Sequence, residues 1–191
     1  MQASLQKYFS VNNNCMKSVG FAVENARAAR GISGFLSEIF KGERFVAACV
    51  GTDAVIGDSL GPLVGSLLTE RLNGETFVYG TFSAPVTARD VEPLARFLRL
   101  AHPDAKVLAI DAAVGRAEEL GKIKLSDEPL QPGLGVKKRL CPLGDASLIG
   151  VIAENSAASR PLGGVRMAEV WKAAAVIADG VRLYFDELCR R

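Results

Sequence analysis

The chain has 191 residues, of which 49% are hydrophobic. This composition supports one globular domain with a sizeable core and excludes an intrinsically disordered chain. Its 23 basic and 21 acidic residues leave a net charge of +2, which gives no electrostatic signature for binding nucleic acid or a membrane surface. No apolar run approaches the roughly 20 residues that span a bilayer. We therefore expect neither a transmembrane helix nor, from residues 1–5, a signal peptide.

The cysteines indicate the compartment in which the protein works. None of the four belongs to a Cys-x-x-Cys pair, and we read them as free thiols: Cys15, Cys49, Cys141 and Cys189. Free thiols are typical of a reducing cytoplasm, and the missing pairs argue against a zinc site.

The first half of the chain predicts an arm, a helix, a strand and a second helix. Residues 1–20 show no period, and we expect a loose N-terminal arm. Apolar residues at helical spacing predict a helix over 23–41, and the apolar run 45–50 predicts a core strand. A glycine-rich loop follows, with a helix from about residue 60 that ends at Asn73-Gly74.

The second half alternates strands and helices. We expect strands over 76–80, 106–111, 121–125 and 148–153, and helices over 89–101 and 165–189. Too few residues separate Asp111 from the strand over 121–125 for a parallel crossover, so that strand should be antiparallel or at an edge. No internal repeat or linker is present, and we treat 1–191 as one domain. The fold class is α/β: a three-layer α/β/α sandwich around a mixed, mostly parallel sheet.

Two carboxylates follow apolar strands at corresponding places. Asp58 lies in the loop after the strand over 45–50, and Asp111 ends the strand over 106–111. Ligands bind at the carboxyl ends of strands in open α/β sheets, so both should face one cleft. Paired carboxylates resist ionising together, which suits an acid and a base that activate water. The structural alternative is that Asp58 caps a helix and Asp111 caps a loop.

Gly57-Asp58-Ser59-Leu60 also spells the motif of the GDSL esterases, with Ser59 as the nucleophile. Such an enzyme needs a histidine base, and the chain contains only His102. This histidine precedes the strand over 106–111, at the end opposite Asp111, and a strand of five residues spans ~17 Å. A Ser-His arrangement is therefore geometrically poor, and we favour the aspartate pair.

A proline- and glycine-rich stretch, 127–136, follows the fourth strand. Its glycines Gly133 and Gly135 permit backbone angles that other residues avoid. The stretch either shapes a substrate groove or forms a plain turn. As candidates for substrate binding we take five residues from this stretch and the glycine-rich loop: Thr52, Asp53, Ser59, Gly133 and Gly135.

The motifs together resemble a known family. Gly51-x-Asp53 and 57–64 (Gly-Asp-Ser-Leu-Gly-Pro-Leu-Val), the segment 107–112, Pro-Gly-Leu-Gly-Val over 132–136 and Gly144-Asp145 are similar to the YyaC family of sporulation proteins. That family is related to the spore germination protease and, more distantly, to the hydrogenase maturation endopeptidases. The likeness extends over roughly residues 44–155.

The resemblance implies a phosphorylase/hydrolase-like α/β/α fold and a peptidase activity carried by Asp58 and Asp111. The germination protease cleaves the small acid-soluble proteins that coat spore DNA, so the implied partner is a protein or peptide substrate in the cytoplasm of the forespore or spore. The hydrogenase maturation relatives hold nickel between two acidic residues and a later histidine. No histidine follows Asp111, and we expect neither a metal nor another cofactor.

Two functions remain open. The first is a sporulation-associated endopeptidase that uses the aspartate pair. The second is a non-catalytic sporulation factor that keeps the fold and binds a peptide or protein partner. Retention of both aspartates favours the enzyme, and the sequence does not determine the substrate or the oligomeric state.

Overall fold

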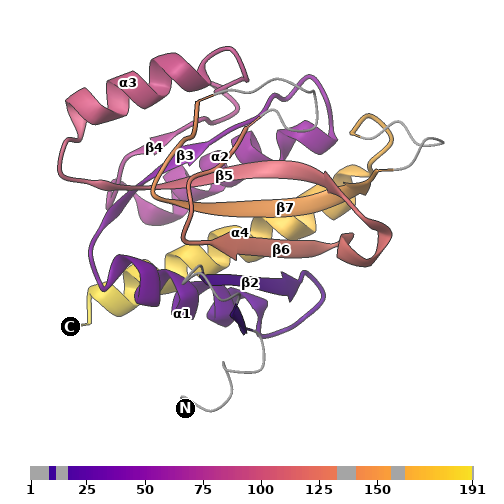
Figure 1. Cartoon of the computed structure of the whole chain (residues 1–191), viewed down its shortest axis with the longest axis horizontal. Helices are drawn as coiled ribbons and strands as arrows, with labels where there is room; N and C mark the ends of the chain where they lie inside the picture. The colour runs from indigo at the N-terminus through magenta and orange to yellow at the C-terminus, as the bar shows by residue number, and fades with distance from the viewer. Residues whose placement is uncertain (1–8, 12–16, 133–140, 156–161, 191) are drawn as a thin grey trace.

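The computed structural model describes residues 9–11, 17–132, 141–155 and 162–190. In these ranges, none of the helices combines the length and the apolar character that a membrane span requires. The elements, shown in Figure 1, run in the order β1 (Phe9–Val11), β2 (Lys17–Ala22), α1 (Ala28–Phe40), β3 (Phe45–Cys49), η3 (Gly57–Ser59), α2 (Leu60–Leu72), β4 (Val78–Tyr79), α3 (Val91–Ala101), β5 (Lys106–Gly115), η4 (Ala117–Glu119), β6 (Lys122–Ser126), β7 (Ala146–Glu154) and α4 (Met167–Leu188).

One mixed sheet forms the middle layer. Its strand order is β1-β2-β6-β7-β5-β3-β4 in the described part of the chain. The neighbours from β4 to β7 are parallel, whereas the neighbours from β7 to β1 are antiparallel. The parallel half therefore brings the carboxyl ends of β3, β5 and β7 to the same side.

Helices cover both faces of the sheet, which confirms the α/β fold expected from the sequence. On one face, α1, α2 and α4 pack against inward side chains such as Phe45, Leu108 and Ile123. On the other face, α3 packs against Val46 and Ala109, and Figure 1 shows it on the side of the sheet opposite to α1 and α4. A strand that is covered on both faces has apolar side chains throughout, which explains the continuous run in β3.

The N-terminal segment differs from the loose arm that we expected. Residues 17–22 form β2, which pairs with β6, and residues 9–11 pair with β2. Val19 and Phe21 alternate with polar or small residues and are buried in the core, so the signal is a period of two that is too short to recognise alone. Residues 9–11 and 17–22 are therefore part of the sheet, and the rest of the expected arm lies outside the described residues.

Two other boundaries differ from expectation, and the placement of β6 decides between two expected alternatives. Helix α1 begins at Ala28 rather than Val23, because residues 23–27 form a turn in which Val23 donates to the Gly121 carbonyl. Strand β5 continues to Gly115 instead of ending at Asp111, since β7 pairs with it along this extension. Strand β6 is antiparallel, as expected, but lies inside the sheet between β2 and β7.

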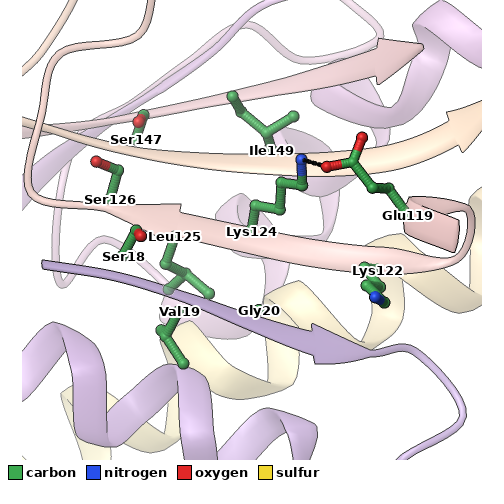
Figure 2. A pocket seen from close by; sticks show the side chains of 10 residues that line it. All are labelled: Ser18, Val19, Gly20, Glu119, Lys122, Lys124, Leu125, Ser126, Ser147 and Ile149. Atoms are coloured by element: carbon green, nitrogen blue, oxygen red, sulfur yellow. Dashed lines mark hydrogen bonds and ion pairs between the residues drawn. The ribbon is translucent and has the colours of Figure 1, made fainter. Parts of the chain in front are cut away.

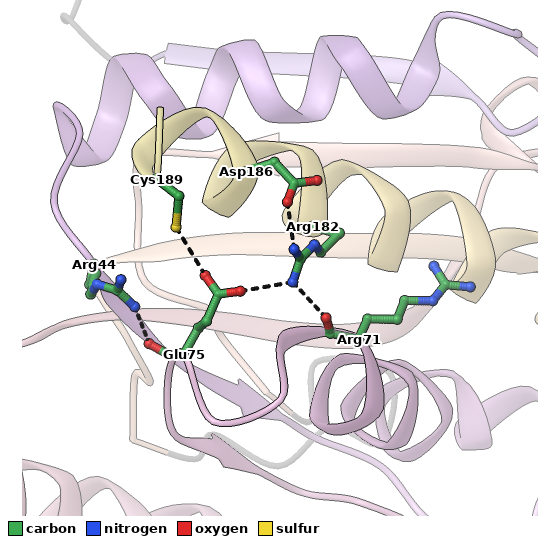
Figure 3. Close-up of polar contacts among 6 residues, drawn as sticks. All are labelled: Arg44, Arg71, Glu75, Arg182, Asp186 and Cys189. Atoms are coloured by element: carbon green, nitrogen blue, oxygen red, sulfur yellow. Dashed lines mark hydrogen bonds and ion pairs between the residues drawn. The ribbon is translucent and has the colours of Figure 1, made fainter. Parts of the chain in front are cut away.

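A polar network joins the C-terminal ends of α2 and α4 (Figure 3). The Arg182 guanidinium donates to the Arg71 carbonyl at 2.7 Å and to the Glu75 carboxylate at 2.8 Å. Arg182 also pairs with Asp186 at 2.6 Å, and Arg44 donates to the Glu75 carbonyl. These bonds hold α2 against α4 and thereby fix the direction in which the start of α2 points.

Helix α2 begins in direct contact with the backbone of β3. A Cβ atom on Gly61 would lie 1.9 Å from the Val50 carbonyl oxygen, and one on Gly65 would lie 2.0 Å from the Gly80 carbonyl oxygen. Any side chain at either position would force the helix away from the sheet. This close approach places η3 and Asp58 directly over the end of β3.

We predict that Gly61→Ala lowers the free energy of unfolding by at least ~2 kcal/mol, because the new methyl group meets rigid backbone. Urea unfolding followed by circular dichroism measures the change. The matched control is Gly163→Ala, since a Cβ atom there has no neighbour within 4 Å. Equal unfolding midpoints for the two variants would contradict the role given to this contact.

Candidate active site

The loop after β3 folds back over the end of that strand. Gly51 donates its amide to the Val86 carbonyl at 2.9 Å, and Thr52 donates to the Asp58 carbonyl at 3.1 Å. Gly51 adopts φ +143°, and a Cβ atom there would lie 2.1 Å from the Asp58 carbonyl oxygen. The glycine is therefore needed for the tight path that returns the chain to η3.

Asp111 lies at the place where β3 ends. The pairing of β3 with β5 runs from Phe45 and Lys106 to Cys49 and Ile110, so Asp111 is the first β5 residue beyond it. The space next to Asp111 is taken by η3, which packs against β5. Asp111 Oδ1 accepts a hydrogen bond from the Ala112 amide at 2.7 Å. The fold thus brings Asp58 and Asp111 to one side of the sheet.

The surroundings raise the pKa of both carboxyls, to different extents. Burial raises the pKa of Asp111 to about 8; the Ala112 amide opposes this shift, and the charge of Asp58 adds to it. Burial also raises the pKa of Asp58, while a hydrogen bond from the Thr52 backbone opposes the shift. Asp111 therefore holds a proton at neutral pH, and Asp58 is the nearby charge that it senses.

The other candidate residues differ in their exposure and in their hydrogen bonds. Asp53 is exposed beside the pair, and Thr52 is half-buried with its hydroxyl accepting from the Ala54 amide. Ser59 is buried, and its hydroxyl donates to the Ile56 carbonyl at 2.6 Å, so it faces away from solvent. It occupies the N-cap position of α2 without a side-chain cap. Gly133 and Gly135 lie outside the described residues.

The only histidine lies away from the carboxylates. His102 ends α3 and precedes β5, and its Nε2 lies 2.7 Å from the Tyr79 hydroxyl. The side chain is thus at the amino end of β5, whereas Ser59 is at the carboxyl end of β3. This placement agrees with the argument against a Ser-His nucleophile.

Two apolar side chains at the site were not expected from the sequence. Val55 is 36% exposed and Ile56 is 43% exposed, and both precede η3 in the loop that carries Asp58. A pair of apolar residues inside a loop rich in glycine and aspartate has no core face to occupy. This pattern is the signal in the sequence that could have indicated the exposed pair. Exposed apolar residues at the rim of a polar site suit contact with an apolar part of a ligand.

Within the part of the chain that the structure describes, the carboxylates have no companions that would complete a metal site. Among the described residues, no group of three or more His, Cys, Asp and Glu side chains is arranged to hold a metal ion. The site thus consists of the half-buried Asp111 carboxyl, which holds a proton, and the Asp58 carboxylate, whose pKa is also raised. This arrangement can donate a proton from one group and accept a proton at the other.

Comparison with known proteins identifies a family and a curated relative, and it finds a similar solved structure. The family described as "Protein of unknown function (DUF1256)" matches residues 21–180. The uncharacterised protein YyaC of Bacillus subtilis (strain 168) is 36% identical over 163 residues, which cover 83% of this chain and 80% of YyaC.

Among solved structures, the [NiFe] hydrogenase maturation protease HycI from Thermococcus kodakarensis KOD1 matches with a TM-score of 0.49 and 19% identity, over 82% of this chain and 99% of that one. A likeness at this level assigns no activity. The match to the family and the identity to YyaC are much stronger, and they confirm the resemblance seen in the motifs: the chain belongs to the YyaC-type family described as DUF1256.

Proposed function

We propose that this protein is a peptidase in which Asp58 and Asp111 hydrolyse a peptide bond. The observation that carries the proposal is the environment of Asp111, whose half-buried carboxyl has its pKa raised to about 8 by desolvation and senses the charge of Asp58. A carboxyl that stays protonated at neutral pH is unusual on a structural residue and is typical of an acid-base site.

The two carboxyls take complementary roles in this reaction. The Asp58 carboxylate accepts a proton from a water molecule, whose oxygen attacks the carbonyl carbon of the peptide bond. The Asp111 carboxyl donates its proton to the departing amine. The proton that Asp58 took from water then passes to the Asp111 carboxylate, which returns both residues to their starting state. The exposed Val55 and Ile56 contact the substrate chain at the rim.

The resemblance to the spore germination protease guides the choice of substrate. The peptide belongs to a protein of the sporulating cell, and the small acid-soluble proteins of the spore are the first candidates. The reaction then takes place in the cytoplasm of the forespore or spore. This part of the proposal depends on the motifs around both aspartates.

We expect Asp58→Asn and Asp111→Asn each to lower cleavage more than ~100-fold, because one removes the base and the other the acid. Pure protein is incubated with spore protein extract, and new peptide termini are mapped by mass spectrometry. Asp104→Asn is the control, since Asp104 is an exposed loop residue before β5. Full activity in a folded variant of either aspartate would refute the mechanism, and an inactive wild type would favour the non-catalytic factor.

Stability should report the proton on Asp111. Its pKa is about 8 in the folded protein against ~3.9 for an unfolded Asp, so the folded state binds more protons between these values. Stability therefore falls as the pH rises from about 4 to about 8, by up to ~1.4 kcal/mol per pH unit.

We predict that Asp111→Asn removes this fall, so the variant gains stability relative to the wild type as the pH rises from 5 to 7.5. Urea unfolding at both pH values measures the difference, and Asp104→Asn should behave like the wild type. The assignment of the proton to Asp111 is wrong if the wild type and Asp111→Asn lose stability in parallel.

Ser59→Ala should leave cleavage within about 3-fold of the wild type, because the buried hydroxyl donates to the Ile56 carbonyl and has no histidine base beside it. The same mass-spectrometric assay measures the rate. Labelling of Ser59 by a fluorophosphonate probe would instead support an esterase mechanism.

A further inference from the structure

Part of the sheet is not covered by a helix within the described chain. Helix α3 packs over β3 and β5, while β2, β6 and β7 carry a groove of about 410 Å³ on the same face. Figure 2 shows small and polar side chains on the floor of this groove. These side chains include Ser18, Ser126, Ser147 and Lys124, and apolar residues such as Ile149 and Leu125 line the groove as well.

Three serines form a row across neighbouring strands. Ser18 on β2 is the register partner of Ser126 on β6, and Ser126 is the partner of Ser147 on β7. Figure 2 shows the three side chains one after another along the groove. Each hydroxyl can both donate and accept a hydrogen bond. We call Ser18, Ser126 and Ser147 the serine row.

The serine row adjoins the aspartate pair. Ile149 on β7 is the parallel partner of Asp111 and the antiparallel partner of Lys124. Register partners point to the same face of a sheet, so Asp111, Ile149 and Lys124 form a second row beside the serines. The floor of the groove is therefore continuous with the Asp111 side chain.

The hydroxyl groups of the serine row are available to a ligand. Ser147 is only 5% exposed, lines the groove and has no hydrogen-bond partner among the described residues. Ser126 accepts one hydrogen bond, from the Glu128 amide at 3.2 Å, which leaves its own hydrogen free. The Ser147 Oγ is not among the enclosed polar atoms that lack a partner in the described chain, so it opens into the groove and is available to a ligand.

The part of the groove beside the serine row has little net charge, because Lys122, the other lysine of the lining, lies four residues along β6 from Ser126. The Lys124 ammonium is paired with the Glu119 carboxylate, which also accepts a bond from the Arg116 amide. These contacts lower the pKa of Glu119 to about 2, so the ion pair persists across the physiological range. Among the described residues that line the groove, Lys122 at its far end is the charged group without an ion pair, so a charged side chain lying on the serine row itself has no charged partner beside it.

We propose that the groove binds an extended peptide segment of small, uncharged residues that lies on one side of the cleaved bond, with the serine row bonded to its main-chain amides. The inference rests on the proposed peptidase function. With strands ~4.8 Å apart and ~3.3 Å per residue along a strand, Ser18 lies ~16 Å from Asp111. The groove therefore accommodates about five extended residues.

The experiment removes single hydroxyls from the serine row and leaves both aspartates unchanged. Wild type, Ser147→Ala and Ser126→Ala act on a synthetic decapeptide mixture that carries Gly, Ala, Ser, Glu or Lys at each position, and products are read by mass spectrometry. We expect the wild type to favour Gly, Ala and Ser over about five positions on one side of the bond. Each variant should lose about 5- to 10-fold in kcat/KM, mainly through KM.

Ser33→Ala is the matched control. Its hydroxyl is also buried, at 1% exposure, and has no partner among the described residues, but it belongs to α1 on the other face of the sheet. Removing an unpaired buried hydroxyl should preserve or raise stability in both Ser33→Ala and Ser147→Ala. Only Ser147→Ala should lower kcat/KM, and unchanged kcat/KM and selectivity in both serine-row variants would overturn the inference.

A wild type that cleaves none of the peptides would refute the peptidase function without deciding the inference. In that case, amide NMR spectra of the wild type are recorded with and without the same decapeptide mixture. Shifts concentrated at the serine row support a peptide-binding groove on a non-catalytic protein. If the amide signals of these three residues do not shift, the proposed groove is overturned.

Discussion

At Gly61 the backbone of α2 approaches the Val50 carbonyl so closely that no side chain fits between them. This contact determines where η3 lies, because η3 leads directly into α2. It also depends on the early end of β3, since a longer strand would occupy the space beside Asp111. The candidate site therefore arises from a backbone contact between a helix and a strand, and the carboxylates are carried into place by it.

The electrostatics of the pair follow from the same arrangement. Asp111 belongs to a strand with neighbours on both sides, so burial is the largest cause of its raised pKa, ahead of the charge on Asp58. Asp58 lies in a short helix at the surface of the sheet, where the Thr52 amide stabilises its charged form. Position in the fold thus separates an acid from a base although both residues have the same side chain.

The two helical layers of the sandwich cover the sheet to different extents, and this difference determines the surface next to the site. Among the described residues, the helices α1, α2 and α4 cover one face of the sheet, whereas α3 covers part of the other. The strands that α3 leaves uncovered carry small and polar side chains, which include the serine row. The resulting groove begins at the register partner of Asp111, so the uncovered part of the sheet and the carboxylates form one continuous surface.

Long or strongly patterned segments were predictable from the sequence because their signals are local. The apolar run of β3, the helical period of α2 and α4, and the stop at Asn73-Gly74 each depend on neighbouring residues only. The same local reading, with the rule that parallel strands end at one side of a sheet, was enough to single out Asp58 and Asp111.

Other features were decided by contacts between distant parts of the chain. The N-terminal strand β2 exists because β6 pairs with it and the core buries Val19 and Phe21, and β5 extends past Asp111 because β7 pairs with the extension. The serine row depends on the register of three strands that are far apart in the sequence. The sequence by itself determined the α/β architecture and the two carboxylates, while strand pairing in the tertiary structure decided their burial, their different pKa values and the groove beside them.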